Sequence, residues 1–193
     1  MRIIIAVRPP EEGKSRLAPV LSLAERVDLN RRLFAHVAGV CRAFAGPDRC
    51  IVVSRSEDLL GQARKQRMTA VTERGSTLPA ALAQGMEVAA GQGDGPVLTI
   101  ATDLPALSPA DLAAMADAAQ GVDVVIAPDW TGQGTNALLL ARPGLIPCRH
   151  GPGSRAAHVT EADRAGLRHV LVELPGLARD IDTPEDLARG PAV

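Results

Sequence analysis

The chain has 193 residues with a formal net charge of −1, and 46% of its residues are hydrophobic while only 2% are aromatic. Its basic residues form no block, which argues against binding along the phosphate backbone of a nucleic acid, and the scarcity of aromatic rings argues against stacking on single-stranded bases. A chain of this length buries about 70% of its unfolded surface around one core. We therefore expect a single domain over residues 1–193 that acts on small molecules and not on nucleic acid.

The cysteines and the first apolar segment bear on location. Cys41, Cys50 and Cys148 are odd in number and lack C-x-x-C spacing, so neither a disulfide framework nor a zinc site is indicated. The apolar residues 3–7 are too few for the core of a signal peptide or for a membrane span. The sequence therefore predicts a cytoplasmic protein without a membrane partner.

Apolar runs recur along the chain, and several are continuous rather than alternating, which is typical of strands covered on both faces of a sheet. They lie at residues 3–7, 50–53, 97–101, 122–127, 137–140 and 169–172. Each of these runs is a predicted strand.

Helical patterns occupy the intervals between these runs. A capping box at residues 22–25 precedes apolar positions spaced by three or four over residues 29–44, a face that suits either the core or a homodimer interface. Ser108 and Thr183 each stand before a proline, as an N-cap stands before the first helical residue. A further helix is expected near residues 79–89. Strands that alternate with helices predict an α/β fold, with a mostly parallel sheet and helices on both faces.

Residues 11–19, with the sequence EEGKSRLAP, follow the first predicted strand. The letters GKS at 13–15 match the end of a P-loop, but Arg8 stands where that motif needs its first glycine. The segment is therefore not a P-loop. It still combines a glycine with the charges of Lys14 and Arg16, so we expect a loop that contacts phosphate groups.

Three aspartates occupy the segments where an open α/β sheet binds its ligands, at the carboxyl ends of strands. Asp103 follows the run at 97–101, and Asp180 and Asp182 face the same way if their segment is extended. Mg²⁺ typically takes one or two carboxylates together with substrate phosphate oxygens and water, so Asp103 and Asp180 predict a magnesium site. Capping of the next turn explains Asp103 equally well. For Asp182, which stands beside Thr183, capping is the favoured explanation.

Two loops rich in glycine and hydroxyl groups follow later strands, at residues 131–136 and 150–155. Backbone N–H groups in such loops bind phosphate or carboxylate. If Ser154 begins a helix, His158 lies on the same face one turn later, where a ligand contact and a structural role are both open. No G-x-S-x-G motif is present, so Ser15 is not expected to act as a nucleophile.

Six segments together resemble, in the same order, the motifs of the 2-phospho-L-lactate guanylyltransferase family, and they span nearly the whole chain. They are IIIAVR at 3–8, GKSRLA at 13–18, DLPAL at 103–107, GTNALL at 134–139, HGPGS at 150–154 with His158, and DIDTPEDL at 180–187. The family includes phosphoenolpyruvate and 3-phospho-D-glycerate guanylyltransferases, which serve the biosynthesis of the deazaflavin coenzyme F-420.

The resemblance implies a Rossmann-like nucleotidyltransferase fold, related to the molybdenum-cofactor guanylyltransferases, and a reaction. GTP and a phosphorylated three-carbon acid would give a guanosine diphospho-acid and pyrophosphate, with Mg²⁺ as cofactor. The residues it assigns to metal binding are Asp103 and Asp180, which with Lys14 and Arg16 form the expected catalytic set. The residues it assigns to the nucleotide are Ala6, Arg8, Lys14 and Arg16. The residues it assigns to the phospho-acid are Thr135, Gly151 and Ser154.

Three positions depart from the family pattern. Arg8 replaces the usual lysine and keeps the positive charge, Pro79 follows Leu78 where the family commonly has an asparagine, and residues 54–56 lack an aspartate often found there. These changes bear on base selectivity more than on chemistry. The alternatives are a nucleotidyltransferase for another acceptor, such as a molybdopterin or a sugar phosphate, and a non-catalytic nucleotide-binding protein.

Overall fold

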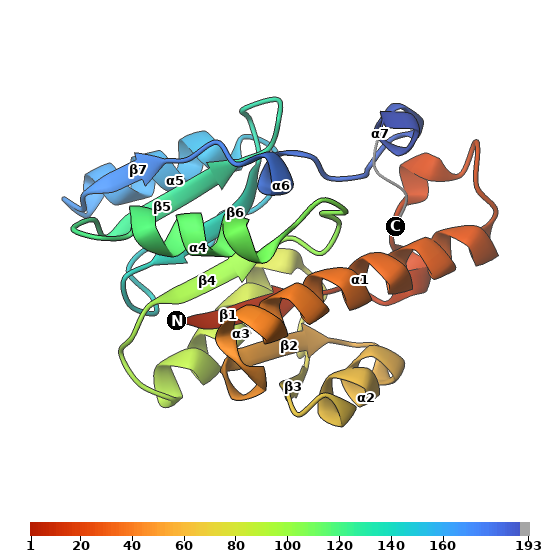
Figure 1. Cartoon of the computed structure of the whole chain (residues 1–193), viewed down its shortest axis with the longest axis horizontal. Helices are drawn as coiled ribbons and strands as arrows, with labels where there is room; N and C mark the ends of the chain where they lie inside the picture. Colours follow the sequence, from red (N-terminus) through yellow and green to blue (C-terminus); the bar gives the residue numbers. More distant parts are fainter. Residues whose placement is uncertain (190–193) are drawn as a thin grey trace.

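The computed structural model describes residues 1–189, and its centre is one sheet with the strand order β3–β2–β1–β4–β6–β5–β7 (Figure 1). The strands are β1 (Arg2–Ala6), β2 (Cys50–Ser54), β3 (Thr69–Thr72), β4 (Val97–Ile100), β5 (Val124–Pro128), β6 (Thr135–Leu140) and β7 (His169–Leu171). All neighbouring strands pair in parallel except that β6 runs antiparallel to both β4 and β5. The mostly parallel α/β fold predicted from the sequence is confirmed.

The reversal of β6 follows from a short connection. Residues 129–134 form a tight hairpin loop, which can join only antiparallel neighbours, whereas a parallel neighbour needs a long crossover. The carboxylate of Asp129 holds this loop, because its Oδ1 accepts hydrogen bonds from the backbone N–H groups of Gln133 and Gly134, both at 2.9 Å. The amino end of β6 therefore lies at the same edge of the sheet as the carboxyl ends of β1 and β4.

The helices begin where local capping signals place them. They are α1 (Leu23–Ala45), α2 (Glu57–Lys65), α3 (Leu78–Gly91), α4 (Pro109–Ala118), α5 (Ser154–Arg164), α6 (Pro175–Ala178) and α7 (Pro184–Arg189), with 3-10 turns η1 (Pro10–Glu12), η2 (Ser15–Leu17) and η3 (Pro47–Arg49). Capping boxes of Ser22 with Glu25 and of Ser108 with Asp111 start α1 and α4. The sequence predicted the first box and, for α4, Ser108 as the N-cap. None of the helices in the described part of the chain has the length and apolar character needed to cross a membrane.

Two apolar layers cover the two faces of the sheet. Ile3 and Ile5 of β1 point into the layer that α1, α2 and α4 cover, and Ile4 points into the layer beneath α3 and α5 (Figure 1). This alternation explains why β1 reads as a continuous apolar run. Phe34 and Val37 of α1 are fully buried against the sheet of the same chain, so much of the apolar face at 29–44 serves the core.

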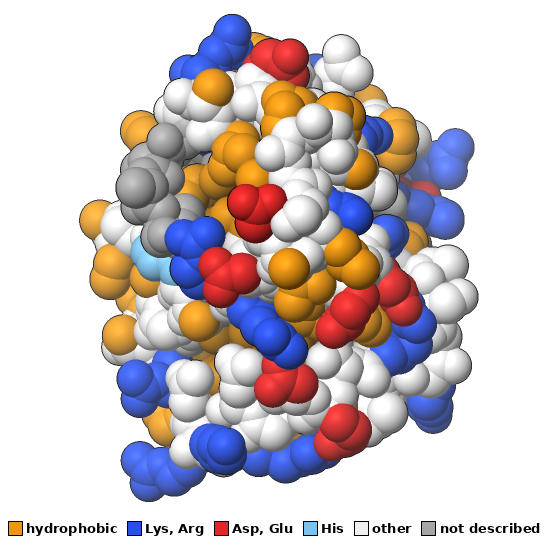
Figure 2. Space-filling model, turned by 90° about the vertical axis from the view of Figure 1, so that its right-hand side faces the viewer, with side chains coloured by type: hydrophobic (Ala, Val, Ile, Leu, Met, Phe, Trp, Pro, Cys, Tyr) orange, Lys and Arg blue, Asp and Glu red, His pale blue; other side chains and the backbone are white. Residues whose placement is uncertain are grey.

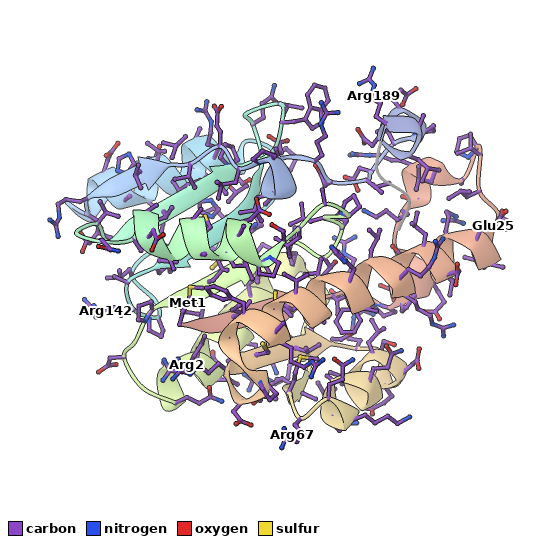
Figure 3. All side chains as sticks on the ribbon, in the orientation of Figure 1. Met1, Arg2, Glu25, Arg67, Arg142 and Arg189 are labelled. Carbon is purple, nitrogen blue, oxygen red and sulfur yellow. The ribbon has the colours of Figure 1, made fainter. Side chains whose placement is uncertain are left out.

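The beginning of α1 extends beyond the sheet edge where β1 and β2 end. Figure 3 shows Glu25 at this end of the molecule, with Arg189 above it on the same side and Met1 and Arg2 on the other side. Figure 2 views the molecule from this side and shows acidic and basic side chains close together near the middle of the face. The candidate site lies at this edge.

Candidate functional site

A cleft of about 640 Å³ opens at the carboxyl ends of β1 and β4, a size typical of small-molecule sites. It is lined by the loop after β1, the loop after β4, the start of β6, the loop at 150–154, and the segment before α7. All the residues that the resemblance assigns line this one cleft: Ala6, Arg8, Lys14, Arg16, Asp103, Thr135, Gly151, Ser154 and Asp180. Residues separated by more than a hundred positions are thus brought together by the sheet.

Lys14 lies between two carboxylates on the floor of the cleft. Its Nζ is 2.6 Å from Oδ2 of Asp103 and 2.9 Å from Oδ1 of Asp182, and its side chain is 7% exposed. Burial alone would lower the pKa of Lys14, but the charges and hydrogen bonds of Asp103 and Asp182 outweigh burial and raise it. Lys14 is therefore a fixed positive charge in the cleft.

The backbone of Lys14 adopts a left-handed conformation with φ 58° and ψ 35°, just before η2. For a residue with a Cβ this conformation costs about 1 to 2 kcal/mol. The ion pairs with Asp103 and Asp182 offset this cost. Lys14 is therefore held in a strained backbone conformation beside Asp103 and Asp182.

Asp103, Asp180 and Asp182 form an acidic cluster, because one oxygen from each can be chosen so that all three lie within 4.8 Å of one another. The backbone N–H of Ile181 donates to the carbonyl oxygen of Asp103 at 3.1 Å and ties the two segments together. Ile181 itself is buried, so the aspartates on either side of it turn toward the cleft.

Asp180 differs from the other two aspartates in its surroundings. Within residues 1–189 it makes no ion pair with a lysine or arginine, whereas Asp103 and Asp182 both pair with Lys14. Burial, followed by the negative charge of Asp103, raises the pKa of Asp180 to about 6. Such a carboxylate is suited to a cation supplied from outside the chain.

The prediction that Asp182 serves as a helix cap is wrong. The start of α7 is capped instead by Thr183 and Asp186, whose side chains and backbone N–H groups exchange hydrogen bonds of 2.8 to 3.3 Å. The Asp182 carboxylate faces the cleft and pairs with Lys14 and, at 3.6 Å, with Arg16. In the described part of the chain the Asp103 side chain likewise bonds to Lys14 and caps no turn.

The opposite wall of the cleft is a loop built for close approach of a ligand to the backbone. Gly151 and Gly153 have φ of 135° and 73°, values that favour glycine. Ser154 begins α5, so the condition set for His158 is met. The backbone N–H of Arg155 donates to the carbonyl oxygen of Gln133 and fixes this loop against the β5–β6 hairpin. His158 lies one turn into α5, fully buried behind the wall, and does not line the cleft.

The sequence prediction missed several cleft residues. Apolar Leu59, Leu78 and Leu82 line the cleft, and so does Thr99. Asn136 and His150 line it too, in the two loops at 131–136 and 150–155 that the sequence indicated. The leucines could not be told from core residues by pattern alone. Thr99 lies inside an apolar run that reads as strand, and only the fold shows that it faces the site.

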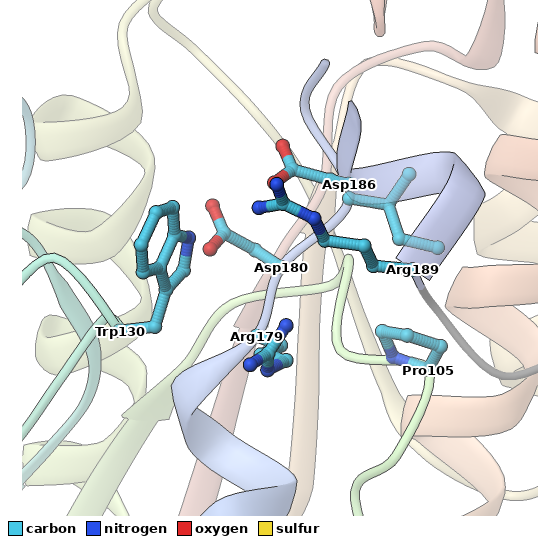
Figure 4. Close-up of a pocket in the computed structure, with 7 residues that line it drawn as sticks. Pro105, Trp130, Arg179, Asp180, Asp186 and Arg189 are labelled. Atoms are coloured by element: carbon cyan, nitrogen blue, oxygen red, sulfur yellow. The ribbon is translucent and has the colours of Figure 1, made fainter. Parts of the chain in front are cut away.

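A small hollow beside Asp180 is lined by Trp130, Arg179 and Arg189, among others (Figure 4). In the close-up the Asp180 carboxylate lies between the Trp130 ring and the Arg189 side chain. The hollow has a volume of only about 10 Å³, about enough for one water molecule. Asp180 lines both this hollow and the main cleft, and the hollow is too small to hold a ligand of its own.

Comparisons with known proteins agree with this geometry. The chain is 40% identical over 190 residues to the phosphoenolpyruvate guanylyltransferase of Rubrobacter xylanophilus, covering 96% of this chain and 92% of that protein. It is 36% identical over 185 residues to the 2-phospho-L-lactate guanylyltransferase of Methanothermobacter thermautotrophicus, covering 95% and 81%.

The fold is similar to that of a solved structure described as a nucleotide-diphospho-sugar transferase from Desulfovibrio desulfuricans. The TM-score is 0.74 at 18% identity, and the match covers 97% of this chain and 85% of that one. At this identity the likeness concerns the fold alone. Residues 1–189 match the family described as "Guanylyl transferase CofC like", and the chain belongs to that family.

Proposed function

We propose that this protein is a guanylyltransferase that joins GMP from GTP to the phosphate of a small phosphorylated three-carbon acid, releases pyrophosphate, and serves the biosynthesis of coenzyme F-420. The observation that carries the proposal is the single cleft in which Lys14 and the acidic cluster face the glycine loop at 150–154. Relatives named for phosphoenolpyruvate and for 2-phospho-L-lactate support the acceptor class. 3-Phospho-D-glycerate belongs to the same class.

The reaction requires alignment and charge neutralisation more than proton transfer. An oxygen of the acceptor phosphate attacks the α-phosphorus of GTP, a new phosphorus–oxygen bond forms, and the bond from the α-phosphorus to the oxygen that bridges it to the β-phosphorus breaks as pyrophosphate leaves. The acceptor phosphate is already ionised at neutral pH, so no general base is needed. Lys14 and Arg16 stabilise the negative charge on the phosphates, and the glycine loop orients the acid.

The acidic cluster fits a divalent cation. Asp103 and Asp180 would hold Mg²⁺, with Asp182 near enough to contribute, since one oxygen from each lies within 4.8 Å of the others and Asp180 has no cationic partner within the described chain. When bound, Mg²⁺ supplies positive charge to the phosphate oxygens of GTP. Lys14 holds Asp103 and Asp182 in their orientation toward this position.

Location in the cytoplasm is part of the same proposal. The three cysteines are free thiols, and burial raises the pKa of Cys50 to about 11 and that of Cys148 to about 12. Protonated, unpaired thiols suit a reducing compartment. The cytoplasm also supplies GTP.

Pyrophosphate release tests the proposal. Purified protein with GTP and Mg²⁺ is assayed with 2-phospho-L-lactate, phosphoenolpyruvate and 3-phospho-D-glycerate, with ATP in place of GTP as a control. Pyrophosphate release with one of the acids, when GTP but not ATP is the nucleotide, supports the proposal and identifies the acceptor. If no pyrophosphate is released with any of the three acids although the protein binds GTP, another acceptor or a non-catalytic binding role is favoured.

A further inference from the structure

His158 is a fully buried histidine that contacts one residue assigned to the phospho-acid and the base of the loop that carries two others. Its Nδ1 is 3.0 Å from Oγ1 of Thr135, and its Nε2 is 2.9 Å from the backbone nitrogen of Arg149. Thr135 lines the cleft at the start of β6, and Arg149 directly precedes the loop at 150–154. One imidazole ring therefore connects the two parts of the cleft wall that are assigned to the phospho-acid, the start of β6 and the loop at 150–154.

The two contacts determine where the ring carries its proton. A backbone N–H can only donate, so Nε2 of His158 must accept and carries no hydrogen. The ring is neutral, since burial and the neighbouring His150 lower the pKa of His158 to about 3. Its single proton is then on Nδ1, and Nδ1–H donates to the hydroxyl oxygen of Thr135.

This donation determines what the Thr135 hydroxyl can do. An oxygen that accepts from Nδ1–H keeps its own hydrogen for another acceptor, and among the described residues Thr135 makes no other side-chain hydrogen bond. Because Thr135 lines the cleft beside Gly151 and Ser154, the free O–H group can be directed at a ligand there. A hydroxyl that donates favours phosphate or carboxylate, which offer only acceptors.

No formal positive charge is needed behind this wall. His150 lies beside His158, with ring centroids 5.1 Å apart, and burial lowers the pKa of His150 to about 4. The Arg149 side chain points elsewhere and pairs with Glu161 at 3.2 Å. The wall therefore binds an anion through oriented O–H and N–H groups.

We propose that His158 is a positioning residue that makes the Thr135 hydroxyl a hydrogen-bond donor to an anionic group of the phosphorylated acid and holds the 150–154 loop beside it. The proposal rests on the assignment of the acceptor to this wall. It adds to that assignment a residue that never touches the substrate.

Two substitutions of His158 separate its two hydrogen bonds. His158→Asn places an amide N–H near the position of Nδ1 and keeps the donation to Thr135, while His158→Gln places a carbonyl oxygen near Nε2 and keeps only the contact with Arg149. Thr135→Val removes the hydroxyl at nearly constant shape, and Thr135→Ser keeps it. Thermal unfolding of all four variants shows which of them fold as the wild type does.

We expect the KM for the acid to rise about tenfold or more in Thr135→Val and in His158→Gln, because a hydrogen bond to a charged group is lost. The KM for GTP should change less than about twofold. The double variant Thr135→Val, His158→Gln should have a KM for the acid no higher than that of the more affected single variant. His158→Asn and Thr135→Ser should stay within about threefold of the wild type. Equal losses in His158→Asn and His158→Gln, or a parallel rise in both KM values, would show a merely structural role.

Two readouts judge the proposal even if the wild type transfers nothing. Long-range ¹⁵N–¹H NMR of the histidines should show a neutral His158 with its proton on Nδ1 at pH 7, and a proton on Nε2 would overturn the proposal. Binding of inorganic phosphate, measured by calorimetry, should weaken in Thr135→Val and His158→Gln and persist in Thr135→Ser. Unchanged phosphate binding in all variants would overturn the proposal, whereas an inactive wild type that binds phosphate as expected would count only against the proposed reaction.

Discussion

Lys14 and Asp103 are separated by 89 positions in the chain and meet at 2.6 Å between Nζ and Oδ2. Lys14→Met keeps the length of the side chain and removes its charge. Among the described residues Asp103 then has no ion pair, and Asp182 keeps only its long contact with Arg16, at 3.6 Å, beside Asp180. We expect turnover to fall at least 100-fold and, without Mg²⁺, stability to fall by about 2 kcal/mol, since the carboxylates are partly exposed and screened.

Arg16→Met is the matched control for this change, because Arg16 is largely exposed and its contact with Asp182 is long, at 3.6 Å. It should lower turnover with little effect on stability. Thermal unfolding with and without Mg²⁺, together with pyrophosphate release, measures both quantities. A Lys14→Met variant that turns over as the wild type does would exclude a role for Lys14 in charge neutralisation.

Asp180→Asn should make the metal-free protein more stable at pH 7. The pKa of Asp180 is about 6 in the folded protein and 3.8 is its ordinary value, so between these values the folded protein binds more protons than the unfolded chain. Stability therefore falls as the pH rises through this window, and above it the full cost of the buried charge is present. Removing the charge should add about 1 to 2 kcal/mol at pH 7, less than the pKa difference implies because the group is partly exposed.

The advantage of Asp180→Asn should disappear near pH 4, where the wild-type carboxyl is protonated. Asp182→Asn is the control: it loses ion pairs with Lys14 and Arg16, so it should give no gain at pH 7. Unfolding temperatures from pH 4 to pH 8 test both variants. If the difference in unfolding temperature between the wild type and Asp180→Asn does not depend on pH, Asp180 is not the group that titrates in this range.

Gly151→Ala should weaken binding of the acid specifically. Gly151 has φ 135° and lies in the cleft wall, so a Cβ there forces the loop to shift. We expect the KM for the acid to rise about tenfold while the KM for GTP is unchanged. Gly144→Ala likewise places a side chain at a positive φ, 77°, but outside the cleft, and should lower stability by about 1 kcal/mol without changing either KM.

Two glycines in helices should respond oppositely to alanine. A Cβ on Gly85 of α3 would lie 2.5 Å from Cγ2 of Ile4, whereas one on Gly39 of α1 would meet no atom within 4 Å. Gly85→Ala should lower stability by about 1 to 3 kcal/mol through overpacking, and Gly39→Ala should raise it by about 0.5 to 1 kcal/mol through helix propensity. Urea unfolding of both variants checks the sign. Stabilisation by Gly85→Ala would mean that α3 can move away from β1 freely.

The parts of the fold that carry local signals could be predicted from the sequence. Ser22 with Glu25 and Ser108 with Asp111 mark the starts of α1 and α4, because a capping box is complete within four residues. β3 and α2 were not predicted: Thr69–Thr72 is a short, incompletely buried edge strand without an apolar run, and the apolar positions of α2 are few. The direction of β6 could not be predicted, because it depends on the length of the β5–β6 hairpin loop. That length is known only when the end of β5 and the start of β6 are known.

Within the site, the sequence indicated which residues belong together through a resemblance that covers most of the chain. It could not show what each side chain contacts. The role of Asp182 depends on Lys14, which lies 168 positions away, and the local signal of Thr183 favoured a cap. The role of His158 depends on Thr135, 23 positions earlier on another element, so spacing alone left it open.

Because β6 is antiparallel, the residues at its start line the same cleft as the loops after β1 and β4, so the cleft is lined by two separate parts of the chain. Lys14 and Arg16, which we propose to face the GTP phosphates, come from the first part of the sequence, while Thr135 and the 150–154 loop come from the part after β5. The acidic cluster draws on both parts, through Asp103 and Asp180. Under the proposed function, exchanges in the hairpin and the glycine loop after residue 128 can alter acceptor preference without changing Lys14 or Arg16.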